Sequence, residues 1–325
     1  MKVSTVSREQ QLNIAALAAA DNVGRGYQRK IVNGVCKELS RIVKNSPSES
    51  EYTGKQFNKT WSAYATKLIT QLKARSRPDR FKIFKEGNSK LDFYTFSTVP
   101  IASCAGMGAC EDWCYSLLSW RYPAAFLGQV QNTILLNNKR GRAYITEAFN
   151  KLPQDITLRL YVDGDFKNTD QVAYWQTLLK TRPNINAYGY SKSWKEFVQF
   201  AKTGTFADNY MLNTSSGSIH GALMRKAMSK LDVTRGNFVA VQVDPKYLES
   251  STYQRNNKTV RSAPYQDRYH PLAKAYQHAV RLAARKDYGK KVYACPGKCG
   301  NCLPNNIHAC GSRQMQDVTI AIGIH

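Results

Sequence analysis

Apolar residues recur along this chain in two different rhythms, and the change between them divides the chain near residue 80. Up to that point the apolar positions follow a period near 3.6 residues, which is typical of amphipathic helices. The pattern predicts helices over 8–45, with a break at two glycines, and over about 55–74. A basic linker with a proline follows at 74–80. We therefore divide the chain into a helical N-terminal region, 1–80, and a core, 81–325.

In the core, short runs rich in β-branched and aromatic residues alternate with longer helical patterns. The expected strands are 92–98, 156–162, 185–190, 209–214, 237–243, 290–294 and 318–324. The expected helices between them are about 117–137, 140–151, 168–181, 193–202, 219–230 and 267–286. Repeated strand–helix units predict an α/β fold with a mainly parallel sheet and helices outside it. An open sheet and a partial (β/α) barrel both satisfy this pattern.

Polar side chains come directly after several of these strands. In parallel α/β folds the chemistry collects at the carboxyl ends of the strands. Asp163 and Asp165 follow one strand and are candidate catalytic groups or metal ligands, although Asp-Gly-Asp is also an ordinary turn. Lys192 follows the next strand and is a candidate contact for phosphate or a solvated surface lysine. The remaining candidates form a turn that resembles an anion-binding helix start, so we expect a cofactor contact there: Ser215, Ser216 and Ser218.

Seven of the eight cysteines form two tight groups, and only Cys36 stands apart. The first group is Cys104, Cys110 and Cys114, and the second is Cys295, Cys299, Cys302 and Cys310. Thiolates at such short spacings converge on one point, as a zinc ion or an iron–sulfur cluster requires. The sequence therefore predicts one or two metal centres, with [4Fe–4S] favoured by ligand type and spacing and zinc as the alternative.

The second group raises a question about an open coordination position. Its first three cysteines resemble in spacing the triplet that holds the [4Fe–4S] cluster of radical S-adenosylmethionine enzymes, which leave one iron open for that cofactor. Here the triplet lies near the C-terminus, and Cys310 is close enough in sequence to close the site. S-adenosylmethionine is therefore expected as a cofactor only if Cys310 leaves one iron open.

Net charge is the second strong signal. It is +24, from 47 basic and 23 acidic residues, and a charge of this size attracts polyanions. Two stretches carry most of it: 1–90 has 18 basic against 7 acidic residues, and 251–293 has 10 against 2. Both interleave aromatic and basic residues, a composition that suits nucleic-acid binding. The candidate nucleic-acid contacts are Arg29, Lys30, Lys59, Trp61, Arg75, Arg77, Arg255, Lys258 and Arg261.

Several segments together resemble a known family. They are the stretch from Val99 through Cys114 to Tyr115, the stretch Tyr161–Phe166, the stretch Tyr188–Ser193, and the Cys295-Pro296-Gly297 start of the second cysteine group. Over roughly residues 90–312 the chain resembles a family from bacteriophages and mobile elements that is known as a numbered gene product. The resemblance implies a phage or plasmid origin and a barrel related to radical S-adenosylmethionine enzymes.

These observations lead to one preferred function and two alternatives. We expect a nucleic-acid-binding iron–sulfur protein that acts in phage or mobile-element DNA metabolism. The alternatives are a radical S-adenosylmethionine-like enzyme and a zinc-stapled protein that inhibits a host factor. No apolar run is long enough to span a membrane, and no signal-peptide core precedes the helices, so we expect no membrane partner and a location in the bacterial host cytoplasm.

Overall fold

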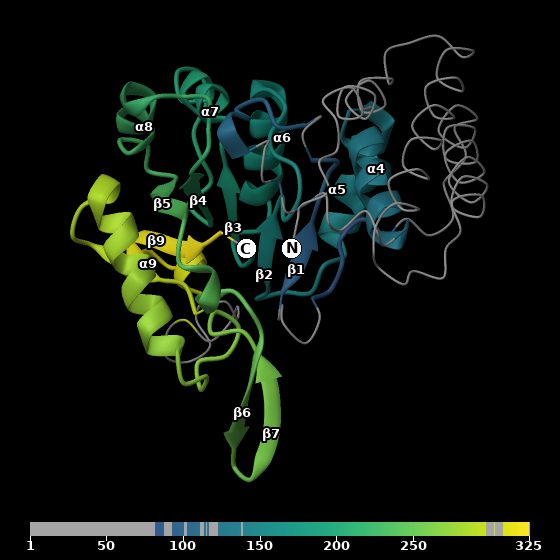
Figure 1. Cartoon of the computed structure of the whole chain (residues 1–325). Coiled ribbons are helices and arrows are strands. Elements are labelled where there is room, and N and C mark those ends of the chain that lie inside the picture. Colours follow the sequence, from purple (N-terminus) through teal and green to yellow (C-terminus); the bar gives the residue numbers. More distant parts are fainter. Residues whose placement is uncertain are drawn as a thin grey trace, which may run out of the picture.

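All of the described residues lie within 81–325, the core predicted from the sequence. The N-terminal helices predicted within 1–80, and the nucleic-acid candidates in them, lie outside the described residues. The computed structural model (Figure 1) describes residues 82–87, 93–100, 103–110, 114, 116, 123–137, 139–296, 302 and 308–324.

A parallel sheet forms the centre of the described structure, as predicted. Each strand lies within or close to the run expected from the sequence. The strands are β1 (Tyr94–Phe96), β2 (Thr157–Leu160), β3 (Asn186–Ser191), β4 (Tyr210–Ser215), β5 (Thr234–Val241), β8 (Val292–Ala294) and β9 (Thr319–Gly323). Their order is β1-β2-β3-β4-β5-β9-β8, and every neighbouring pair is parallel. Among the described strands the sheet is open, with β1 and β8 at its two ends, and it does not close into a barrel.

Helices follow the strands in the expected alternation. They are α4 (Pro123–Leu136), α5 (Lys139–Asn150), α6 (Thr169–Lys180), α7 (Trp194–Phe200), α8 (Ala222–Met228) and α9 (Ala273–Tyr288). No helix in the described ranges is long and apolar enough to cross a membrane.

The two faces of the sheet carry different side chains, because successive strand residues point to opposite sides. On β2, Leu158 and Leu160 are fully buried in the main core, where Trp175 and Leu179 of α6 also lie. The residue between the two leucines, Arg159, is on the other face of the strand. The helix face thus holds the main apolar core, and the opposite face carries a smaller cluster that includes Met211 and Ile320 beside the polar and aromatic side chains of the site.

The last two strands exchange places relative to their chain order, since β9 lies between β5 and β8. Buried Arg235 of β5 helps to fix this arrangement. Its guanidinium donates to the carbonyl oxygen of Met315 (2.5 Å) and of Val318 (2.9 Å), just before β9. Its Nε donates to Oδ1 of Asn213 on β4 (2.6 Å). One side chain therefore joins the segment leading into β9 to the middle of the sheet.

An antiparallel hairpin that the sequence pattern did not predict follows the sheet strand β5. Its strands are β6 (Ser251–Arg255) and β7 (Lys258–Ser262), and they form a separate two-stranded sheet. Asn256 and Asn257 make the turn with φ of 50° and 59°, a conformation that asparagine tolerates better than most residues. The hairpin projects from the rest of the described chain (Figure 1).

Candidate metal and substrate cavity

A cavity of about 320 Å³ lies at the carboxyl ends of the strands. Residues that end or directly follow β2, β3, β4, β8 and β9 line it, as parallel α/β folds commonly arrange their sites, and Phe238 and Ala240 of β5 line it from within their strand. The polar and thiol members of the lining are Cys104, Cys110, Cys114, Ser116, Arg159, Asp165, Lys192, Ser215, Ser216, Cys295, Cys302, His308 and Cys310.

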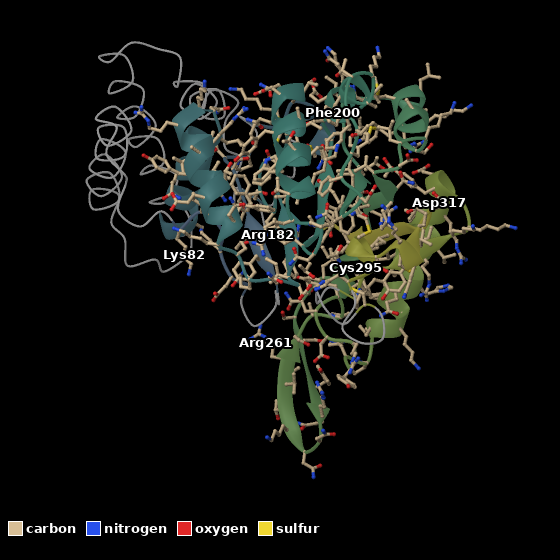
Figure 2. The ribbon with its side chains drawn as sticks, turned by 180° about the vertical axis from the view of Figure 1, so that it is seen from behind. Lys82, Arg182, Phe200, Arg261, Cys295 and Asp317 are labelled. Carbon is tan, nitrogen blue, oxygen red and sulfur yellow. The ribbon has the colours of Figure 1, made fainter. Side chains whose placement is uncertain are left out.

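The two cysteine groups meet at this cavity. All three members of the first group line it, and so do the three described members of the second group. Cys295 directly follows β8 and is labelled in Figure 2. Cys299 lies outside the described residues. The structure therefore brings together two groups that the sequence places at opposite ends of the core.

The first cysteine loop is held against the loops that follow β3 and β4. Met107 pairs with Ser218 in an isolated antiparallel bridge. On either side of it, the Gly108 amide donates to the Gly217 carbonyl (3.1 Å), and the Ile219 amide donates to the Gly106 carbonyl (3.0 Å). A Cβ on Gly106 would lie 1.6 Å from the carbonyl oxygen of Lys192, so this close approach requires glycine.

The second group is anchored through Cys310, which is buried in the short 3-10 turn Ala309–Gly311. The Asn213 side-chain amide donates to its carbonyl oxygen (2.9 Å), and the Tyr190 hydroxyl donates to its thiol. Burial raises the pKa of the Cys310 thiol to about 11, and the Tyr190 hydrogen bond opposes the shift. The backbone around Cys302 is also fixed, because the Tyr293 hydroxyl donates to its carbonyl oxygen (2.8 Å).

The donor chemistry suits a metal–thiolate centre, although the described residues do not close one. Within the described part of the chain, no three Cys, His, Asp or Glu side chains are grouped closely enough to hold one metal ion. Burial also raises the pKa of the Cys110 thiol. Because thiols bind metal as thiolates, loading such a site would release protons. The residues that could hold an iron–sulfur cluster or zinc are the six cysteines of the lining, together with Cys299.

Asp165 and Lys192 are held together at one end of the cavity. The Asp165 carboxylate accepts hydrogen bonds at 2.7 Å from the Lys192 amide, the Ser191 hydroxyl and the Phe166 amide. Burial raises the pKa of Asp165, and the Lys192 amide is the largest opposing influence. The Lys192 ammonium donates to the Ser215 hydroxyl (3.0 Å). Asp165 thus fixes the loop that presents Lys192 to the cavity.

The other predicted polar residues form hydrogen bonds that connect neighbouring segments of the fold. Asp163 lies outside the lining and accepts a hydrogen bond from the Gln129 side chain of α4 (3.0 Å); burial raises its pKa. The Ser216 hydroxyl accepts from the Ala240 amide (3.0 Å), and the Ser218 hydroxyl donates to the Lys192 carbonyl (2.9 Å). These serines join neighbouring loops, and only Ser215 and Ser216 line the cavity.

Sequence reasoning missed the part of the lining that comes from the strands themselves. Arg159, Tyr188 and Tyr190 lie on the face opposite the apolar core, and the Arg159 guanidinium lies over the Tyr190 ring at 4.6 Å from its centroid. The available signal was an arginine between two leucines in an otherwise apolar strand. The cavity thus combines cationic and aromatic side chains with the thiols.

The predicted nucleic-acid contacts fall in two places. Arg255, Lys258 and Arg261 belong to the β6–β7 hairpin, and Arg261 is labelled in Figure 2. The remaining candidates lie outside the described residues: Arg29, Lys30, Lys59, Trp61, Arg75 and Arg77.

Comparison with known proteins gives a family. A family model described as Gene product 88 matches residues 59–304, well over half of the chain. The chain therefore belongs to this phage-type family. The matched range begins inside the predicted N-terminal region. No curated protein and no solved structure matches the chain.

Proposed function

We propose that this member of the Gene product 88 family is an iron–sulfur protein that binds nucleic acid and acts in phage or mobile-element DNA metabolism. The observation that carries the proposal is the meeting of both cysteine groups at one cavity. Iron–sulfur clusters are held by cysteine thiolates, and the thiols here come from two loops that are each fixed by hydrogen bonds to their backbone. When bound, such a cluster would supply electron-transfer chemistry, and zinc would supply a structural link instead.

Charge supports the choice of partner. The chain carries a net charge of +24, and an exposed basic hairpin projects from its core (Figure 1). Lysine and arginine bind phosphates and release counterions, so binding should weaken steeply as salt rises. The cavity adds a place where a single unit of the polymer or a small anionic ligand could enter, because Arg159 and Lys192 both line it.

A specific observation also favours the catalytic alternative. The first cysteine group lies in the connection after β1, the first described strand of a sheet whose first five strands keep their chain order. It has three thiols and no fourth cysteine nearby in sequence, so a cluster held there would keep one open position unless a cysteine of the second group, which lines the same cavity, filled it. The volume of about 320 Å³ lies at the lower end of the range of ligand pockets, which is about 300–1,000 Å³. A radical S-adenosylmethionine-type enzyme is therefore our second candidate.

The chain's own residues have clear tasks under either candidate. Lys192 would bind an anionic group of the ligand, because Asp165 and Ser215 fix its loop and its ammonium. Tyr188 and Tyr190 would contact a planar or apolar part and exclude water from it.

One experiment distinguishes the two candidates. The purified, reduced protein is mixed with S-adenosylmethionine, and reductive cleavage of the cofactor is measured. Cleavage that is lost in Cys110→Ser but retained in Cys36→Ser would establish the catalytic reading. Salt-dependent DNA or RNA binding without cleavage would leave the binding protein as the better account.

A further inference from the structure

The β6–β7 hairpin has two faces with different surroundings. Directly opposite residues of an antiparallel pair share a face, so Tyr253 and Val260 lie on one side with Arg255 and Lys258. This face packs against the segment that follows the hairpin. The Tyr253 hydroxyl donates to the Asp267 carboxylate. The Arg255 guanidinium carbon lies over the Tyr269 ring, 3.8 Å from the ring centroid.

The second face is directed entirely to solvent. Its residues are Thr252, Gln254, Thr259 and Arg261, and all four are exposed. The tip residues Asn256 and Asn257 are exposed as well, and so is Lys258 beside them, although its side chain lies on the first face opposite Arg255. This surface has hydrogen-bonding and cationic side chains and neither an apolar nor an acidic one.

The charge and the side-chain types of this surface indicate which class of partner it can bind. From residue 250 to residue 266 the sequence contains no aspartate or glutamate. Protein interfaces usually have an apolar or aromatic centre, which this face lacks. Arginine and lysine recognise guanine edges and phosphates, and asparagine and glutamine recognise adenine edges. The surface therefore fits a polyanion that also offers hydrogen-bonding edges.

We propose that the β6–β7 hairpin is a ribbon that enters the major groove of duplex DNA. The major groove of B-form DNA, about 12 Å wide, admits a two-stranded antiparallel ribbon. The deep, narrow major groove of an RNA duplex does not. The proposal rests on the proposed nucleic-acid function and makes it specific, because it names the form of nucleic acid and the element that reads it.

The test uses the full chain and fluorescence anisotropy over a range of salt concentrations. The probes are a labelled DNA duplex, a single strand of the same sequence and an RNA duplex. The variant is Lys258→Ala with Arg261→Ala, two exposed positions whose loss should leave the sheet intact. The control is Lys202→Ala with Lys230→Ala, exposed lysines that follow α7 and α8.

We expect the wild-type chain to prefer the DNA duplex to the RNA duplex and the hairpin variant to lose that preference. For two lost phosphate contacts the slope of log affinity against log salt should become shallower by about 1.8. The control should keep the wild-type slope. An unchanged DNA preference in the hairpin variant, or an equal loss in the control, would overturn the ribbon while leaving nucleic-acid binding in place. Absence of any binding by the wild-type chain at low salt would overturn the proposed function as well.

Discussion

Single residues in the cavity are held by hydrogen bonds that oppose the cost of their burial. Asp165 is the clearest example, because three donors surround its carboxylate and burial still raises its pKa. Such a carboxylate is costly when ionised, and its hydrogen bond from the Lys192 amide fixes the loop that presents Lys192 to the cavity. We therefore assign Asp165 a positioning role, which can be tested separately from catalysis.

The pH dependence of stability tests the environment of Asp165. Its folded-state pKa is raised above the ordinary 3.8, so the folded chain holds the proton more tightly than the unfolded chain does. The stability that this group contributes is present below pH 3.8 and is lost as pH rises through the folded-state pKa. Asp165→Asn should lack that part of the decline when urea unfolding is followed across this pH range.

Exposed Asp244 provides a contrast in the same experiment. The Lys246 side chain hydrogen-bonds to it and lowers its pKa, so its contribution is lost as pH falls. Asp244→Asn should therefore change the pH profile in the opposite direction. Identical profiles for the wild type and Asp165→Asn would contradict the assignment of Asp165 as a buried, destabilised carboxylate.

Gly106 tests how closely the first cysteine loop must approach the sheet. A Cβ at this position would meet the Lys192 carbonyl at 1.6 Å, so Gly106→Ala should displace the loop that carries Cys104 and Cys110. We expect bound metal to fall several-fold while circular dichroism shows the helices and sheet retained. Gly221→Ala is the matched control, because a Cβ there has nothing within 4 Å. Full metal content in Gly106→Ala would show that the loop position does not matter.

The helices and strands of the core could be predicted from the sequence, because each produces its own local pattern of apolar and polar residues. The runs around Leu158 and around Ile320 are apolar enough to mark buried strands, and both strands formed where expected. The exchange of β8 and β9 was not readable, because it depends on contacts such as those of Arg235 with Val318, which are distant in sequence. The hairpin was missed because most residues of its strands are polar, so the packed face that carries Tyr253 and Val260 leaves only a weak apolar alternation.

The candidate site could be predicted only in part. Residues that follow strands could be expected at one edge, and Asp165, Lys192 and Ser215 do lie there. Asp244 also follows a strand but is exposed on the short turn beside Lys246. Arg159 was missed because it comes from within a strand, and its position depends on which face the helices cover.

The connection between β8 and β9 should couple metal binding to folding. It carries the whole second cysteine group, and Cys302 is linked to β8 through Tyr293. Cys302→Ser should therefore lower both iron content and the melting temperature, because forming a metal site contributes to folding. Cys36→Ser, outside both groups, should change neither. A Cys302→Ser chain with full iron and an unaltered melting curve would remove this cysteine from the centre.

For the whole molecule, the uneven charge predicts that more than one surface binds nucleic acid. Residues 1–90 hold 18 basic against 7 acidic residues, a larger excess than in the stretch that contains the hairpin. Removing residues 1–80 should lower DNA or RNA affinity at least about tenfold at low salt and reduce its salt dependence, while the metal centre remains. Anisotropy and iron analysis of the same preparation check both parts. Unchanged affinity would show that the N-terminal region is not a binding arm.

A metal centre would explain why both cysteine groups line one cavity, and its presence can be measured directly. The most direct measurement is the visible absorption spectrum and metal content of the full chain purified without oxygen. We predict a brown protein with about four or eight irons per chain, as one or two [4Fe–4S] clusters require. A colourless protein with stoichiometric zinc and no iron would contradict the account.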